Sequence, residues 1–128
     1  MTVKYNVISR GNPADPAAPE KYYVSIKSSG RVTLRELSRQ IAEISTVSTV
    51  DTMAVLEGLL TVIPRQISNG NIVELGDFGT IWMSIQSEGS DTPEEVKAGN
   101  IKRVSARFTP GKEFKQVLSN TQFVKNGS

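Results

Sequence analysis

The chain is 128 residues long, 38% hydrophobic and 22% charged, and it contains neither cysteine nor histidine. This length and composition are those of one globular domain. The missing residue types exclude a Ser-His-Asp or Cys-His nucleophile, an imidazole base and a zinc site of the usual kind. We therefore expect no enzymatic activity, no metal and no cofactor. No disulfide can form, which is compatible with a reducing cytoplasm.

The ends and the longest apolar runs give no sign of export or membrane insertion. The first ten residues lack the apolar stretch of a signal peptide, and apolar runs such as residues 53–56 are too short to span a bilayer. The grouped carboxylates, Asp77 and the pair Glu94 and Glu95, have no catalytic partner in the sequence. The sequence predicts a soluble, cytoplasmic protein with no membrane partner and no small-molecule substrate.

Charge is segregated along the chain although the net charge is only +2. Residues 1–31 carry a net charge of +3 and residues 101–128 carry +5, whereas residues 32–79 and 80–100 each carry −3. Basic ends of this kind suggest an anionic partner. The alternative is that the charges are merely scattered over a solvated surface.

The N-terminal segment predicts two short strands, residues 3–8 and 21–27. Apolar and polar residues alternate with period two in both. The apolar positions are Val3, Tyr5 and Val7 in the first strand and Tyr22, Val24 and Ile26 in the second. Three prolines between residues 11 and 19 exclude a helix in the connection. We expect the two strands to pair with each other or to join the edge of a sheet.

A hairpin of two helices is predicted next. Capping signals at residues 33–36 and 48–51 each precede an apolar stripe at helical spacing. The first helix is expected to end near Ser45, and the Asn-Gly-Asn turn at residues 69–71 ends the second. Pro64 lies within the second helix, where it is expected to remove one backbone bond and bend the axis.

Beyond the helices the hydrophobic period changes to two. Residues 72–75 and 80–86 are expected to be strands on either side of a glycine-bracketed turn. The polar, acidic stretch 87–100 is expected to be a loop or an extended arm, and residues 101–109 a returning strand. A short helix then opens at Pro110 and continues to about Leu118, followed by a frayed tail.

The order of these elements resembles that of the HU/IHF family of bacterial histone-like DNA-binding proteins. The resemblance covers residues 33–118 and is most specific in two stretches. Val73-Glu-Leu-Gly-Asp-Phe-Gly-Thr80 is similar to the strand-turn-strand signature of the family. Arg107-Phe-Thr-Pro-Gly-Lys-Glu-Phe-Lys115 is similar to its return strand and final helix start. The whole chain looks most like the longer HU-like form with an N-terminal strand extension that is found among Bacteroidetes.

This resemblance implies an α+β, IHF-like fold, in which a helical hairpin is combined with a three-stranded antiparallel sheet, a β-arm and a short C-terminal helix. An N-terminal two-strand extension is added to it. The implied division of the chain is an extension at 1–31, an HU/IHF-like domain at 32–120 with its arm at about 87–100, and a tail at 121–128.

The resemblance also implies an intertwined homodimer whose two sheets form a saddle for double-stranded DNA. The family bends DNA through phosphate contacts with little sequence readout, which implies a nucleoid-associated role in DNA condensation. The residues themselves also favour a dimer. One helical hairpin and a small sheet leave the long Leu/Ile stripe poorly covered in a monomer.

Five basic residues are the candidate DNA-binding positions. Lys112 and Lys115 match the basic positions at the family's final helix start, where they would contact phosphates. Arg103 and Arg107 alternate with apolar residues, so they share the outer face of the returning strand, which would line the saddle. Their guanidinium groups suit phosphate oxygens. Lys102 is a weaker candidate, because alternation directs it to the opposite face.

The arm departs from the family pattern. The family's arm is rich in arginine with an Arg-Asn-Pro tip, whereas residues 87–97 contain four acids and one base. Carboxylates repel phosphates. Pro93 is the only candidate wedge between base pairs in this arm, and a turn residue is the preferred interpretation of it. The alternative to a DNA-binding protein is therefore an HU-derived interaction or structural module that has lost DNA binding.

Trp82 also has two candidate roles, because it is expected on the strand face away from the helices. It could stack against sugars or base edges of DNA. It could instead be covered by the N-terminal strands with Tyr5, Tyr22 and Tyr23, which is the interpretation we favour.

Overall fold

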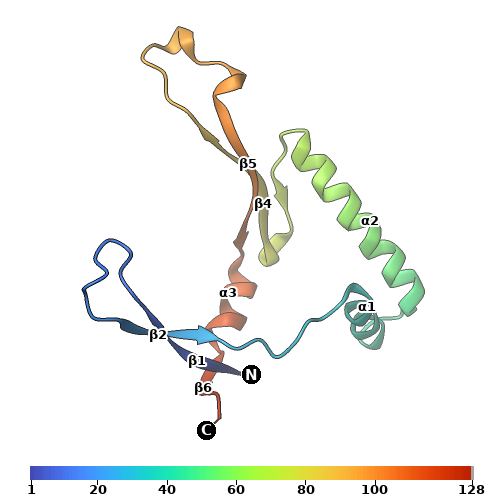
Figure 1. Cartoon of the computed structure of the whole chain (residues 1–128). Coiled ribbons are helices and arrows are strands. Elements are labelled where there is room, and N and C mark those ends of the chain that lie inside the picture. Colours follow the sequence, from blue (N-terminus) through green and yellow to red (C-terminus); the bar gives the residue numbers. More distant parts are fainter. Residues whose placement is uncertain (128) are drawn as a thin grey trace. The chain divides into compact units, whose positions relative to one another are not determined.

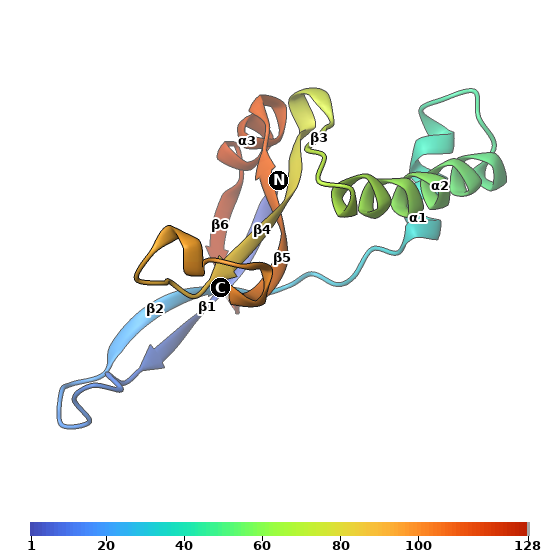
Figure 2. The ribbon, with the colours of Figure 1, turned by 90° about the horizontal axis from the view of Figure 1, so that it is seen from above.

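The computed structural model describes residues 1–127 and forms two compact units (Figure 1). The first unit contains residues 1–33 together with residues 117–127. The second contains residues 34–116 and has the α+β architecture expected from the sequence. Figure 2 shows the same elements from above, with the two strands β4 and β5 running out into the arm.

The first unit is a three-stranded sheet with the order β2-β1-β6. Its strands are β1 (Thr2–Arg10), β2 (Lys21–Ile26) and β6 (Gln122–Lys125). β1 and β2 are antiparallel, with Tyr5 opposite Ile26 and Val7 opposite Val24. The predicted pairing of the two N-terminal strands is therefore confirmed, and their apolar positions share one face of the sheet.

The tail was predicted to be frayed, and this prediction is wrong. β6 runs parallel to β1, with Val3 opposite Phe123. The backbone N–H of Gln122 donates to the carbonyl of Met1 at 2.9 Å, and that of Asn126 to the carbonyl of Tyr5 at 2.8 Å. The outer edge of β1 offers unpaired backbone groups, and the tail satisfies them. The extension is thus a sheet of three strands rather than two.

The second unit begins with the predicted helical hairpin. α1 (Leu34–Glu43) and α2 (Thr49–Ser68) are joined by a short loop. The hydroxyl of Ser48 accepts a hydrogen bond from the backbone N–H of Asp51 at 3.1 Å, which is the expected cap at the start of α2. α2 continues through Pro64 without ending there, and Gly70, with a φ of +88°, follows its C-terminus.

The sheet of the second unit is antiparallel with the order β3-β4-β5. Its strands are β3 (Val73–Glu74), β4 (Gly79–Ser87) and β5 (Ile101–Pro110), and α3 (Lys112–Ser119) follows them. A 3-10 turn, Gly76–Phe78, joins β3 to β4, as the glycine-bracketed motif predicts. The arm between β4 and β5 contains two further 3-10 turns, Pro93–Glu95 and Ala98–Asn100.

The described part of the chain has a very small core. Ile67 of α2, which is 9% exposed, is the only buried hydrophobic residue among residues 1–127. The other buried side chains are those of Ser38 and Thr52. Many large apolar side chains on the three α-helices and on both sheets are exposed instead. A chain with so little internal burial needs a further surface to pack against.

Candidate nucleic-acid interface

The β4–β5 hairpin has two chemically different faces. Three cross-strand pairs of mainly polar residues define one of them, which we call the arginine face: Trp82 opposite Arg107, Ser84 opposite Ser105 and Gln86 opposite Arg103. The intervening apolar pairs occupy the other face: Ile81 opposite Phe108, Met83 opposite Ala106 and Ile85 opposite Val104. Strand alternation alone separates the two sets.

The apolar face is the one that meets the helix. Ile63 and Ile67 of α2 line a shallow hollow of about 340 Å³ together with Ile81 and Met83 of β4. Because alternate residues point to opposite faces of a strand, the arginine face is directed away from α2. Arg103 and Arg107 therefore lie where the sequence placed them, on the outer side of the returning strand.

Both arginines are exposed, and they are four residues apart on β5. That separation corresponds to about 13 Å along the strand. Neither takes part in any of the three ion pairs found among residues 1–127. Two such guanidinium groups on one polar face can each bind a phosphate oxygen pair through parallel N–H donors.

Trp82 stands directly opposite Arg107 across the hairpin, so the indole and the guanidinium share the arginine face. The tryptophan side chain is half-buried. A flat apolar ring beside a cation can pack against sugars or bases next to a bound phosphate. The role favoured from the sequence, coverage of Trp82 by the N-terminal strands, stays a prediction.

Lys102 occupies a different setting from the one that simple alternation predicts. Gln86 lies opposite Arg103 but Ser87 lies opposite Ile101, so Lys102 is the extra residue of a β-bulge. Its ammonium group lies 2.8 Å from a carboxylate oxygen of Glu88. Lys102 is therefore partly neutralised within the chain, unlike the two arginines.

The arm is held at its base by polar contacts that the sequence did not suggest. The side-chain amide of Asn100 donates to the hydroxyl of Ser90 at 2.9 Å and to the carbonyl of Glu88 at 3.3 Å. The backbone N–H of Glu88 donates to the carbonyl of Asn100 at 2.8 Å. Asn100 is thus a structural residue of the arm, as its hydrogen bonds to Glu88 and Ser90 show.

Pro93 is the first residue of a 3-10 turn, and its carbonyl accepts a hydrogen bond from the N–H of Val96 at 3.3 Å. The fixed φ of proline suits this position. The geometry is that of a turn residue, and the role of a wedge between base pairs stays a prediction.

Lys112 and Lys115 are positioned by an aromatic cluster. The rings of Phe78, Phe108 and Phe114 lie 5.3 to 5.7 Å apart, and they join the 3-10 turn, β5 and α3. Such tilted and edge-to-face arrangements are favourable for aromatic rings. Both lysines are exposed and lie three residues apart, on neighbouring positions of the helix surface.

The same junction depends on a close backbone approach. The N–H of Gly111 donates to the carbonyl of Phe78 at 2.8 Å, and the N–H of Lys115 donates to the carbonyl of Gly111 at 3.0 Å. The Pro-Gly-Lys motif therefore has a physical role, since it brings the start of α3 against the turn and fixes where Lys112 stands.

Within residues 1–127, no group of three or more carboxylate, imidazole or thiol side chains is arranged to hold a metal ion. In the same part of the chain, no helix is both long enough and apolar enough to cross a membrane.

A helical hairpin, a strand-turn-strand motif, an arm and a basic final helix together define a protein of the HU type. The family described as "HU domain fused to wHTH, Ig, or Glycine-rich motif" (HU-HIG) matches residues 1–125. The chain belongs to this family. No curated protein matches it.

Two solved structures show the same fold. A "Putative bacterial DNA binding protein" from Bacteroides vulgatus is 12% identical, with a TM-score of 0.68 over 98% of this chain. The chain spans about half, 48%, of that protein. HU of Anabaena, solved with DNA, is 23% identical with a TM-score of 0.55, over 70% of this chain and 99% of the other. The predicted resemblance and fold class are confirmed.

Proposed function

We propose that this protein is an architectural DNA-binding protein that acts as a homodimer and contacts duplex DNA mainly through phosphates. The observation that carries the proposal is the arginine face, on which Arg107 lies opposite Trp82 and Arg103 lies opposite Gln86. Neither arginine takes part in an ion pair within residues 1–127. Family membership and the DNA-bound HU structure support the same partner. A dimer that holds DNA on the β3-β4-β5 sheet of each protomer would bend it, and this bending would condense nucleoid DNA.

The exposed apolar surface of α2 supports the dimer. Val55, Leu59 and Val62 recur at helical spacing and are 69%, 43% and 46% exposed, respectively. They form a second apolar stripe, separate from the one containing Ile63 and Ile67 that lines the hollow against β4. A helix that is apolar on more than one side is a buried helix. A second copy of the chain would bury this stripe.

Charge at the arm favours the second candidate, an interaction module without DNA binding. Glu88 is paired with Lys102, but no ion pair among residues 1–127 involves Asp91, Glu94 or Glu95. Three uncompensated carboxylates would repel a DNA backbone that approached the arm. The two candidates differ in one measurable property, the dependence of DNA affinity on salt.

The test compares the wild type with Arg103→Gln/Arg107→Gln in fluorescence-anisotropy titrations of a labelled duplex at several salt concentrations. The matched control is Arg35→Gln/Arg65→Gln, which removes the same charge from the two helices. We expect the slope of log affinity against log salt to become shallower by about 0.9 for each phosphate that is no longer neutralised, in the first variant only. If both variants changed the salt slope equally, the arginines of the arginine face would contribute only to the net charge of the protein and would not contact phosphates.

A further inference from the structure

The first unit carries a second cationic surface, separate in sequence and in fold from the arginine face. By the register of the sheet, Thr2, Lys4, Asn6, Ile8 and Arg10 of β1 point to one face, and Lys21, Tyr23 and Ser25 of β2 join them. Lys27 follows β2, and its backbone N–H donates to the carbonyl of Lys4 at 2.8 Å, which places it beside Lys4. The basic hairpin face consists of Lys4, Arg10, Lys21 and Lys27.

The cations of this face are placed opposite one another. Arg10 lies directly across the strands from Lys21. Lys27 likewise lies beside Lys4, because these two residues adjoin the Tyr5–Ile26 pair at the end of the register. Like charges directly opposite in an antiparallel pair destabilise a sheet. Such pairs are unfavourable for folding alone, and an anion bound between them removes the repulsion.

No acid compensates these charges within the sheet. The strand positions on the basic hairpin face include no Asp or Glu, and the ion pairs found among residues 1–127 all lie outside the first unit. The nearby turn contains Asp15, whose carboxylate accepts a hydrogen bond from the backbone N–H of Ala17 at 3.2 Å. All four cationic side chains are exposed.

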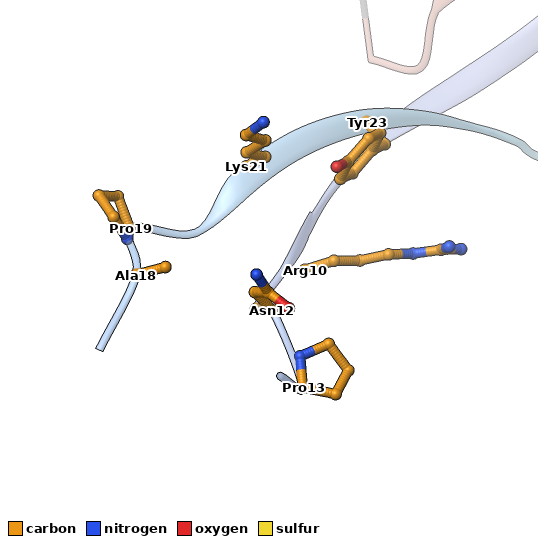
Figure 3. A pocket seen from close by; sticks show the side chains of 8 residues that line it. Arg10, Asn12, Pro13, Ala18, Pro19, Lys21 and Tyr23 are labelled. Carbon is orange, nitrogen blue, oxygen red and sulfur yellow. The ribbon is translucent and has the colours of Figure 1, made fainter. Parts of the chain in front are cut away.

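One end of the basic hairpin face contains a hollow and a guanidinium group whose position is restrained. Arg10 and Lys21 line an open hollow of about 420 Å³ with Asn12 and Tyr23, closed on the turn side by prolines (Figure 3). The guanidinium carbon of Arg10 lies 5.8 Å from the centre of the Tyr23 ring. This cation–π contact restricts the guanidinium to one side of the hollow. The Arg10 guanidinium, a planar donor fork, and the Lys21 ammonium are the cationic groups available to an anion at this end of the face.

The spacing of the two cation pairs fits a linear polyanion better than a single small anion. Lys4 and Arg10 are six positions apart on β1, which corresponds to about 20 Å along an extended strand. Successive phosphates of one DNA strand are about 3.4 Å apart along the axis, so this span covers about six base steps. Both pairs can therefore reach phosphates of one duplex at the same time.

We propose that the basic hairpin face is a second site for duplex DNA phosphates, so that each protomer contacts DNA with its N-terminal sheet as well as with its arginine face. The inference rests on the DNA binding proposed above. It assigns the N-terminal extension a direct role in affinity and in the length of DNA covered.

The test uses the full chain with Lys4→Gln/Arg10→Gln/Lys21→Gln/Lys27→Gln. The matched control, Arg31→Gln/Arg35→Gln/Arg65→Gln/Lys125→Gln, removes the same charge elsewhere. Lys125 lies opposite Tyr5, on the other face of the same sheet. Binding to a labelled duplex is titrated over a range of salt, and melting temperatures verify folding. Because like-charge pairs are removed, we expect the first variant to melt no lower than the wild type.

If all four side chains contact phosphates, the salt slope of the first variant becomes shallower by about 3.6 per protomer, while the control changes little. A change of less than about 0.9, which is the effect of a single phosphate, overturns the proposal while the wild type still binds DNA. A wild type that does not bind DNA at low salt overturns the proposed function itself. A first variant that binds DNA as the wild type does, but no longer binds phosphatidylglycerol vesicles that the wild type binds, is a further outcome. This result would assign the basic hairpin face to membranes and would also overturn the proposal.

Discussion

Gly79 and Gly111 lie where the hairpin meets the start of α3, and neither position has room for a side chain. A Cβ on Gly79 would lie 2.6 Å from the carbonyl oxygen of Thr109, and a Cβ on Gly111 would overlap the backbone carbonyl of Asp77. Gly79 also has a φ of +152°, which disfavours any other residue. The position of Lys112 and Lys115 therefore depends on these close backbone contacts as well as on the phenylalanine cluster.

Gly111→Ala is expected to lower the free energy of unfolding by about 1 to 3 kcal/mol, because the turn and α3 must separate to admit the methyl group. Chemical denaturation measures this change. Gly89→Ala in the arm is the control, since no atom lies within 4 Å of a Cβ there. A Gly111→Ala variant as stable as the control would show that the close approach at this junction is not needed.

Glu36 gives α1 a pH-dependent contribution to stability. The Arg39 guanidinium, 2.7 Å away, and then the Gln40 amide donate hydrogen bonds to its carboxylate and lower its pKa from 4.5 to about 2. Because the pKa is depressed in the folded state, the stabilisation is present above pH 4.5 and is lost as the pH falls towards 2. The hydrogen bond to Glu36, and then the charges of Glu36 and Glu43, raise the pKa of Arg39.

Glu36→Gln should therefore melt at a lower temperature than the wild type at about pH 6, and the difference should shrink by about pH 2.5. Circular dichroism melts at these two pH values measure it. The effect is modest because the pair is solvent-exposed. A difference that stays constant with pH would contradict the assigned cause.

At the scale of elements, the arm is stabilised by polar contacts at its base, while the acids of its outer turns repel DNA phosphates. Its base is closed by Asn100 and by the Lys102–Glu88 pair, and its outer turns carry uncompensated acids. An arm of this kind is ordered by its own hydrogen bonds while its charge opposes DNA. Lys102, the extra residue of the β-bulge, is the cation of β5 that pairs with a carboxylate of the arm.

Glu88→Gln is expected to strengthen DNA binding by up to about fivefold at low salt, since it releases Lys102 and removes one carboxylate. Glu94→Gln makes the same change in charge in the same arm without releasing a lysine, so its effect should be smaller. Anisotropy titrations compare the two. A larger effect of Glu94→Gln would mean that Lys102 is not a DNA contact.

Most elements could be predicted from the sequence, because hydrophobic period, caps and glycine turns are local signals. The cap at Ser48, the glycine turn before β4 and the outward face of Arg103 and Arg107 are such cases. The strand β6 could not be predicted, because its partner β1 is more than a hundred residues away in the sequence. The pairing of Lys102 likewise depends on a bulge in the register, which leaves no local pattern.

At the scale of the whole molecule, each chain leaves too much apolar surface uncovered to be complete alone. Only Ile67 is a buried hydrophobic residue within residues 1–127, while the Val55, Leu59 and Val62 stripe of α2 is exposed. Burial of large apolar side chains is the main favourable contribution to folding. Association and folding are therefore expected to be coupled, so that stability depends on protein concentration.

If the proposed dimer forms through α2, Val55→Asp/Leu59→Asp should convert it into a monomer or prevent folding, because the variant places two charges in the interface. Light scattering and sedimentation measure the oligomeric state, and circular dichroism separates a folded monomer from an unfolded chain. Val32→Asp, at an exposed apolar position outside α2, is the control. A double variant that stays dimeric would exclude this stripe as the interface.

Binding of duplex DNA through its phosphates is tested most directly by the affinity of the wild type for a labelled duplex of about 30 base pairs. Fluorescence anisotropy measures this affinity from low to physiological salt. We predict a steep loss of affinity with salt, abolished when Lys112→Glu/Lys115→Glu reverses the charge at the start of α3. A homogeneous dimer that does not bind DNA at low salt would contradict phosphate binding. DNA binding with no dependence on salt would contradict it as well.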